Sequence, residues 1–249
     1  MRVLNALEQA RGPVSLSDVA KLAELYPSKA HRYLVSLVRT GLAEQEQPSG
    51  HYTLGPAARR LGVEALRRGD EVGIATRHSA ALRDSTQHTT NLATWGDAGP
   101  IIIRWDYGAY PLPITVRVGS TLPLLDSSAG RVFLAYLPQA LTRPALRAQQ
   151  KRGETSTVGD EELAHVLQDV RESGFSVTTG GVIPGLSAIA APVFGSGLGV
   201  ALVMCVAVPT FVLTPGVTKS LVSSLKKAAS AVTHDLGGDV TAVRSSPVD

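Results

Sequence analysis

The stretch from Tyr26 to Arg39 carries polar and basic side chains at the spacing of one helical face. Intervals of three, four and three residues separate Lys29, Arg32, Ser36 and Arg39, which places them on one stripe of an α-helix. Lys and Arg neutralise phosphates, and Arg also binds the edge of guanine in the major groove of DNA. The stripe therefore has the chemistry of a nucleic-acid-binding helix, although a solvated surface helix would carry the same pattern.

Positive charge is concentrated near the N-terminus. The 249 residues have a formal net charge of +3, but the first 69 hold ten Lys and Arg against six Asp and Glu, a net +4. The remaining 180 residues hold fourteen against fifteen, a net −1. This asymmetry fits a small polyanion-binding module joined to a larger, near-neutral domain, and a chance fluctuation of composition fits it equally well.

Three helices are expected in the first 41 residues. The second begins at Ser15, where Ser15 and Asp18 form a pattern similar to a capping box. The third begins at Pro27 and ends at Gly41, because proline is favoured in a first helical turn and glycine after the last. Its expected buried stripe consists of Ala30, Leu34, Leu37 and Val38.

A short β-hairpin is expected after the third helix, with its turn at QPSG, residues 47–50. Three helices and a hairpin are typical of the winged helix-turn-helix, whose third helix enters the major groove of DNA. Helix order, hairpin and local charge together favour DNA binding over a solvated surface helix. The residues expected to contact double-stranded DNA are Ser28, Lys29, His31, Arg32, Ser36, Arg39 and His51.

The rest of the sequence predicts a second domain of mixed helices and strands, so the fold class is α+β with an antiparallel sheet. Helices are expected over 69–88, 127–137, 141–149, 160–174 and 214–236, the last capped by Thr214. Strands are expected over 89–96, 99–108, 113–120, 175–181, 187–195 and 199–209. GSGLG at 195–199 precedes a strand rather than a helix, so it predicts a hairpin turn and not a dinucleotide-binding loop.

No pattern in the sequence supports catalysis or metal binding. The six histidines show neither HxxxH nor HExxH spacing, and no pair of carboxylates stands out. Ser187 begins a strand and lacks the second glycine of a nucleophile elbow. We therefore expect no enzyme, no metal and no cofactor, with a small-molecule hydrolase or transferase using the larger domain as the alternative.

The sequence shows no targeting signal and no membrane span. Its N-terminus lacks a cationic start followed by an apolar run and a cleavage site. The uncharged, largely apolar stretch at residues 196–213 is interrupted by Gly197, Gly199 and Pro209. Cys205 is the only cysteine, which excludes an internal disulfide and suits a reducing compartment. The expected location is the cytoplasm.

Several separated motifs resemble the IclR family of transcription regulators. The family run LPKSTVHRLL is matched by Leu25, Ser28, His31, Arg32 and Leu34. The family pair GY is matched at Gly41, and the run GxYxLG is matched by Gly50, Tyr52, Leu54 and Gly55. Residues 122–138 resemble the family run PLHx(S/T)AxGKAxLA, and residues 173–194 resemble the run that ends in AAPVF. The chain departs from these patterns with Pro27, Lys29, Asp126 and Arg131 in place of Lys, Thr, His and Lys.

This resemblance, which extends from about residue 2 to about residue 237, implies a regulator with a GAF-like effector-binding domain. The expected divisions are a winged helix at 1–56, a linker helix at 57–69, an effector-binding domain at 70–238 and a flexible tail at 239–249. The implied assembly is a homodimer, with a homotetramer as the larger form. The implied effector-binding residues are Ser128, Ala129, Thr178, Leu186, Ala188, Cys205 and Ala207, with Ile114 beside them.

These positions favour a small carboxylate with an apolar body. The helix start at 126–130 offers unpaired N–H groups to an anion, and Ser127 or Ser128 adds a hydroxyl. The facing positions are apolar or nearly so, which favours an aromatic acid over a polar keto acid. Filling of the core is the alternative role for Cys205 and Ala207. Either Trp95 or Trp105 could form a wall of the pocket, but a place in the buried core or in a subunit contact is favoured for at least one of them.

Overall fold

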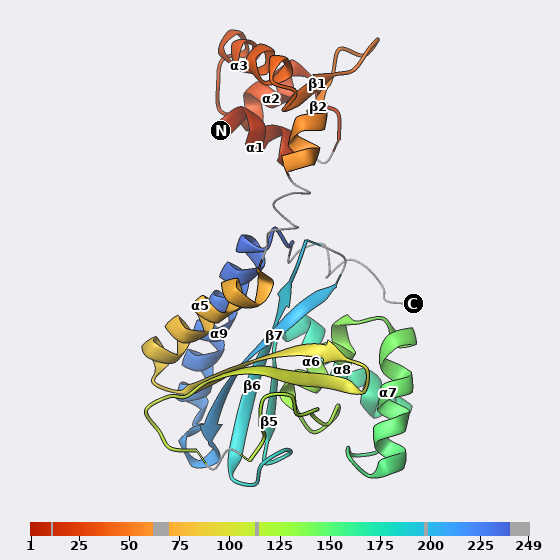
Figure 1. Ribbon diagram of the computed structural model, residues 1–249, viewed down its shortest axis with the longest axis vertical. Coiled ribbons are helices and arrows are strands. Elements are labelled where there is room, and N and C mark those ends of the chain that lie inside the picture. The colour runs from red at the N-terminus through yellow and green to blue at the C-terminus, as the bar shows by residue number, and fades with distance from the viewer. Residues whose placement is uncertain (11, 62–69, 113–114, 197–198, 240–249) are drawn as a thin grey trace. The chain divides into compact units, whose positions relative to one another are not determined.

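The computed structural model of the chain describes residues 1–10, 12–61, 70–112, 115–196 and 199–239. The chain divides into two compact units, Met1–Gly69 and Asp70–Asp249, whose elements are labelled in Figure 1. Ile114 and parts of three expected features lie outside the described residues. These parts are residues 62–69 of the linker helix, 197–198 of the GSGLG turn and 240–249 of the tail.

The first unit has the three helices and the hairpin that the sequence predicts. Its elements are α1 (Arg2–Gln9), α2 (Leu16–Leu22), α3 (Pro27–Arg39), β1 (Ala43–Gln45) and β2 (Tyr52–Leu54), with β1 and β2 antiparallel. The predicted cap of α2 is confirmed, since Ser15 Oγ accepts the Asp18 N–H at 3.2 Å. Val14 and Tyr52 exchange two backbone hydrogen bonds, which join the segment before α2 to the hairpin.

The buried stripe of α3 is narrower than the sequence predicts. Ala30 and Leu34 are fully buried and Leu37 is half-buried, but Val38 is 37% exposed. Val38 lies eight residues after Ala30, which turns it about 80° around a helix of 3.6 residues per turn. Its inclusion in the stripe was therefore wrong, and it lies on the flank of α3.

The second unit is built on an antiparallel sheet. Within the described residues the strand order is β4-β3-β7-β6-β5, and each neighbouring pair is antiparallel. The strands are β3 (Thr89–Gly96), β4 (Gly99–Asp106), β5 (Ser176–Thr179), β6 (Leu186–Phe194) and β7 (Val200–Pro209). Phe194 of β6 pairs with Val200 of β7, so GSGLG joins two antiparallel strands as predicted.

The strand expected over 113–120 is wrong for residues 115–120, which form no strand. The Ser120 N–H donates to the Arg117 carbonyl at 3.0 Å, and Gly119 has a φ of +89°. This turn prevents a continuous ladder with β4, and only the bridge between Ile101 and Thr121 follows it. Alternating valines can thus predict a strand where a local turn determines the backbone.

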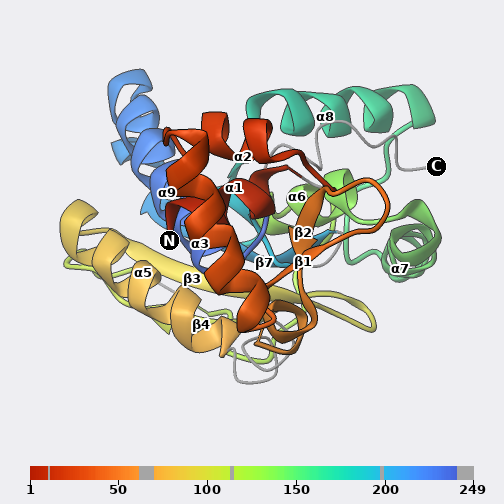
Figure 2. The same cartoon turned by 90° about the horizontal axis from the view of Figure 1, so that it is seen from above.

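Helices cover both faces of this sheet (Figure 2). α5 (Glu71–Thr86) and α9 (Pro215–Asp235) lie on one face, where they pack against Leu92, Ile189, Met204 and Val206. α6 (Ser128–Tyr136), α7 (Gln139–Arg152) and α8 (Asp160–Ser173) lie on the other side. Within the described residues, no helix is both long and apolar enough to span a bilayer.

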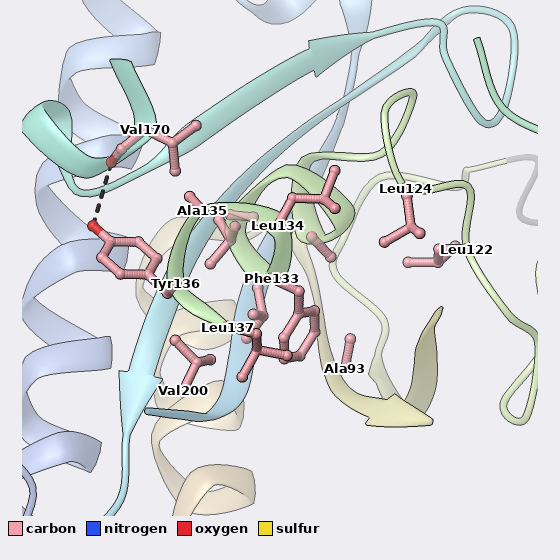
Figure 3. Close-up of a cluster of buried hydrophobic side chains, with 14 of the residues drawn as sticks. Ala93, Leu122, Leu124, Phe133, Leu134, Ala135, Tyr136, Leu137, Val170 and Val200 are labelled. Carbon is pink, nitrogen blue, oxygen red and sulfur yellow. Dashed lines mark hydrogen bonds between the residues drawn. The ribbon is translucent and has the colours of Figure 1, made fainter. Parts of the chain in front are cut away.

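The apolar cluster around α6 fixes this helix against the sheet (Figure 3). Phe133 is fully buried, and its ring packs edge-on against Trp95 with centroids 5.7 Å apart. The Tyr136 hydroxyl donates to the carbonyl of Val170 in α8 at 3.3 Å. These contacts hold α6 against the sheet and against α8.

Two helical glycines provide a matched test of how closely α6 approaches its neighbours. A Cβ at Gly130 would lie 2.3 Å from the Leu124 carbonyl oxygen, whereas a Cβ at Gly216 in α9 would meet nothing within 4 Å. We expect Gly130→Ala to lower the free energy of unfolding by about 1–3 kcal/mol. Gly216→Ala should raise it by about 0.4–1 kcal/mol. Urea denaturation measures both, and equal effects would contradict the close contact at Gly130.

Candidate functional site

The polar stripe of α3 lies opposite the core of the first unit. Ser28, Lys29, His31, Arg32, Ser36 and Arg39 are all exposed. Because Ala30 and Leu34 face the core, Arg32 and Arg39 lie on the far side of the helix. Lys29 and His31 lie on its two flanks. Within the described residues, no side-chain hydrogen bond or ion pair engages Lys29, Arg32 or Arg39, so their charges are available to a polyanion.

His51 belongs to a different element, the hairpin. It is half-buried, and its carbonyl accepts the Glu46 N–H at 2.8 Å. Residues 43–55 contain no Lys or Arg, so the positive charge of this candidate nucleic-acid interface is carried mainly by α3. Arg59, which follows the hairpin, lies 3.7 Å from Glu44 across the exposed surface.

The second unit contains a small cavity on the α6 face of the sheet. The cavity measures about 60 Å³, which is room for several water molecules or part of a small ligand. All the described residues of the expected effector set line it, namely Ser128, Ala129, Thr178, Leu186, Ala188, Cys205 and Ala207. Residues 181–183, in the segment between β5 and β6, complete one side of it.

The floor of the cavity follows from the strand register. Thr178, Ala188 and Ala207 are cross-strand neighbours on β5, β6 and β7. In the next row Cys205 of β7 pairs with Asn91 of β3, and Asn91 pairs with Trp105 of β4. Alanine at two of these positions leaves space above the sheet, because its side chain fills so little volume.

The N-terminus of α6 forms the polar end of the cavity. Ser127 caps the helix, because its hydroxyl accepts the Gly130 N–H at 2.9 Å and donates to the Pro123 carbonyl at 2.6 Å. The N–H groups of Ser128 and Ala129 belong to the first turn, which has no intrahelical acceptors for them. No backbone hydrogen bond to another described segment uses them either.

No charged side chain lines the cavity among the described residues. The carboxylate of Asp126 points elsewhere, since it accepts the backbone N–H of Ser156 at 2.8 Å and is also bonded to the Ser156 hydroxyl. Among all the described residues, no three His, Cys, Asp or Glu side chains cluster as metal ligands would. An anion in this cavity would therefore be held by neutral donors and by the dipole of α6.

The nucleophilic side chains of the cavity are not activated. Burial raises the pKa of the Cys205 thiol to about 12, although a hydrogen bond with the Ser128 side chain partly opposes this. The thiol is therefore protonated at neutral pH and is not a nucleophile. The Ser187 hydroxyl lies 3.2 Å from Thr179 Oγ1 and 3.1 Å from Thr210 Oγ1, and no described histidine lines the cavity.

The two tryptophans have different positions. Trp105 lines the cavity, and its indole N–H donates to the Val116 carbonyl at 3.1 Å. Trp95 packs against Phe133 in the core and does not line the cavity. The sequence left the choice between them open.

Asn91 is a cavity residue that the sequence reasoning missed. It lies within the strand predicted over 89–96, and asparagine is disfavoured in strands. Its position two residues before Ala93 places both side chains on the α6 face. A search of the predicted strands for isolated polar residues could have found it.

Comparison with known families gives two matches that together cover most of the chain. Residues 1–47 match the IclR helix-turn-helix domain, and residues 63–234 match the family model described as bacterial transcriptional regulator IclR C-terminal. The probable transcriptional regulator SauR of Cupriavidus necator is 27% identical over 92% of this chain and 91% of its own.

Two solved structures extend the comparison. Pseudomonas aeruginosa HmgR is 32% identical, with a TM-score of 0.86 and 96% of both chains covered. An IclR homologue from Microbacterium hydrocarbonoxydans, crystallised with 4-hydroxybenzoate, is 22% identical, with a TM-score of 0.56 over 94% of this chain and 96% of its own. At that identity the second likeness shows the fold.

These matches also decide between the two classes of function that the sequence allows. The matched families and curated relatives are transcriptional regulators and not enzymes. They therefore support the regulator over a hydrolase or transferase. With a family model over residues 63–234 and its partner domain over 1–47, the chain belongs to the IclR family of bacterial transcriptional regulators.

Proposed function

We propose that this regulator binds two-fold operator DNA as a homodimer, and that an aromatic carboxylate in the α6 cavity changes its operator affinity. One observation supports this choice of ligand. The N-terminus of α6, whose first N–H groups have no acceptor, opens into an apolar cavity, and none of the described residues that line this cavity is charged. In this proposal residues 1–56 bind DNA, 57–69 link, 70–238 bind the effector and 239–249 are a tail, all within the cytoplasm.

The polar end of the cavity suits a carboxylate. The N–H groups of Ser128 and Ala129 point out of the first turn of α6, where the helix dipole is positive. The described lining supplies no acidic side chain that would repel an anion. A carboxylate here would gain hydrogen bonds from backbone groups that have no acceptor within the helix.

The rest of the cavity suits an apolar body. Ile102, Trp105 and Leu122 line it together with Val182 and Ile183. A polar keto acid would leave hydrogen-bonding groups unpaired against these side chains, at a cost of about 1–3 kcal/mol for each group. The complex of the M. hydrocarbonoxydans homologue with 4-hydroxybenzoate supports an aromatic acid as the ligand class.

Regulation requires that the effector bind differently to DNA-competent and DNA-incompetent arrangements of the chain. The effector then changes operator affinity by its differential affinity for the two arrangements, and DNA changes effector affinity by the same factor. An effector that favours the DNA-incompetent arrangement lowers operator affinity, and one that favours the DNA-competent arrangement raises it.

The DNA-binding assignment can be tested on α3. We expect Arg32→Ala to weaken operator binding by about 1–3 kcal/mol, as for the loss of a direct base contact. Arg39→Ala should weaken binding to all sequences and reduce the salt dependence, as for the loss of a phosphate contact. Mobility shifts over a range of salt measure both, with Arg143→Ala on exposed α7 as the control. A folded Arg32→Ala protein with unchanged operator affinity would contradict the assignment.

The assembly can be tested by light scattering at micromolar concentration. A two-fold operator is read by two copies of the recognition helix, so the expected mass is that of two chains, or of four where dimers pair. Leu61, at the end of the described helical stretch 56–61, is an exposed apolar residue that suits such an interface. The mass of a single chain would contradict the homodimer.

The effector site can be tested by filling it. Ala207 is buried in the cavity floor, so Ala207→Phe should abolish the effect of benzoate on operator binding while DNA binding persists. Leu141→Phe places the same side chain on the exposed face of α7 and should respond like the unaltered protein. Calorimetry that shows tight binding of pyruvate or glyoxylate, and no heat from any aromatic acid, would contradict the ligand class.

A further inference from the structure

The side chain of Asn91 is buried in the cavity without a partner. Asn91 is 5% exposed, and its Oδ1 atom has no hydrogen-bond partner among the described residues. No hydrogen bond joins its amide nitrogen to the described part of the chain either. Buried polar side chains are paired in the large majority of cases, so each exception needs an explanation.

A second buried amide in the same unit shows the usual arrangement. Gln149 is 1% exposed, and its Oε1 accepts the Leu124 N–H at 2.8 Å. Its Nε2 donates to the carbonyls of Ala98 and Leu122 at 3.0 and 3.1 Å. The fold can therefore satisfy a buried amide fully, and Asn91 differs from Gln149 in facing the cavity.

We infer that Asn91 selects among effectors, and that it favours aromatic acids that carry a ring hydroxyl in addition to the carboxylate. This inference rests on the proposed function, because it assigns the carboxylate to the N-terminus of α6. Asn91 then binds the second polar group of the same ligand.

The chemistry of the lining restricts that second group to a neutral one. A second carboxylate or an ammonium group would be buried without an opposite charge, since no described lining side chain is charged. A hydroxyl both donates and accepts, so it pairs with whichever atom of the Asn91 amide faces the ligand. A methyl group of similar size offers neither interaction and leaves the amide unpaired.

The strand register places Asn91 a short distance from the N-terminus of α6, the two proposed binding groups for the ligand. Cys205 contacts the start of α6 through Ser128, and Asn91 is the cross-strand neighbour of Cys205 on β3. Adjacent strands lie about 4.8 Å apart, so Asn91 lies one strand beyond the residue that touches the anion-binding end. A single substituted ring is of the size that bridges such a separation.

The test compares matched ligands on the unaltered full-length protein. Calorimetry is performed with 2-, 3- and 4-hydroxybenzoate, each paired with the methylbenzoate substituted at the same ring position. We expect at least one hydroxyl compound to bind ten-fold or more tightly than its methyl counterpart, because the methyl group leaves a buried amide unpaired.

A variant then identifies the group responsible. Asn91→Leu removes the amide and keeps the number and branching of the side-chain heavy atoms, and it should reduce the ten-fold preference to less than about three-fold by weakening the hydroxyl compound. The matched control is Asn5→Leu, because Asn5 is the only other asparagine of the chain and is exposed on α1. It should retain the full preference.

The outcomes separate this inference from the function on which it rests. Equal affinity within every pair overturns the role of Asn91 and leaves the aromatic-acid proposal standing. A preference that persists in a folded Asn91→Leu protein also overturns it. Absence of binding by all six acids overturns the proposed function together with the inference. If Asn91→Leu does not fold, the comparison on the unaltered protein decides alone.

Discussion

The effector domain depends on how closely the first turn of α6 approaches the segment that precedes it. Gly130 permits this approach, because any side chain there would overlap the Leu124 backbone. Ser127 completes the turn by accepting the Gly130 N–H and donating to Pro123. The apolar cluster around Phe133 then holds the helix against the sheet. Free N–H groups are thereby kept beside an apolar cavity, where their partial charge is poorly screened by water.

The small side chains of the sheet complement this placement. Ala188 and Ala207 lie side by side on β6 and β7 under the helix start, and larger residues there would remove the cavity. The neighbouring Cys205 is held as a neutral thiol by its burial. Shape and neutrality together make the site suited to binding a ligand and unsuited to covalent chemistry.

Local signals made much of the architecture predictable from sequence. Ser15 and Thr214 cap the helices that they were expected to cap, and the alternation along β6 and β7 places Ala188, Cys205 and Ala207 on one face. Where prediction failed, packing or a local turn determined the structure more than the residue pattern did. Val38 lies on the flank of α3 and is exposed, although its spacing suggested the buried stripe. A turn at Gly119 interrupts a segment whose alternating valines are typical of a strand. Asn91 was not predicted as a cavity residue, because its cross-strand neighbours, Cys205 and Trp105, are known only from the strand register.

The two faces of β3 connect the cavity to the helix that begins the second unit. Asn91 faces the cavity, while the adjacent Thr90 faces α5 and donates to the Ser79 carbonyl at 3.1 Å. The Ser79 hydroxyl donates in turn to buried Asp106 at 2.9 Å, and Arg104 also bonds that carboxylate. These hydrogen bonds join β3 to α5 through buried polar groups that are costly to separate. α5 is also the first helix of the second unit and begins immediately after Asp70.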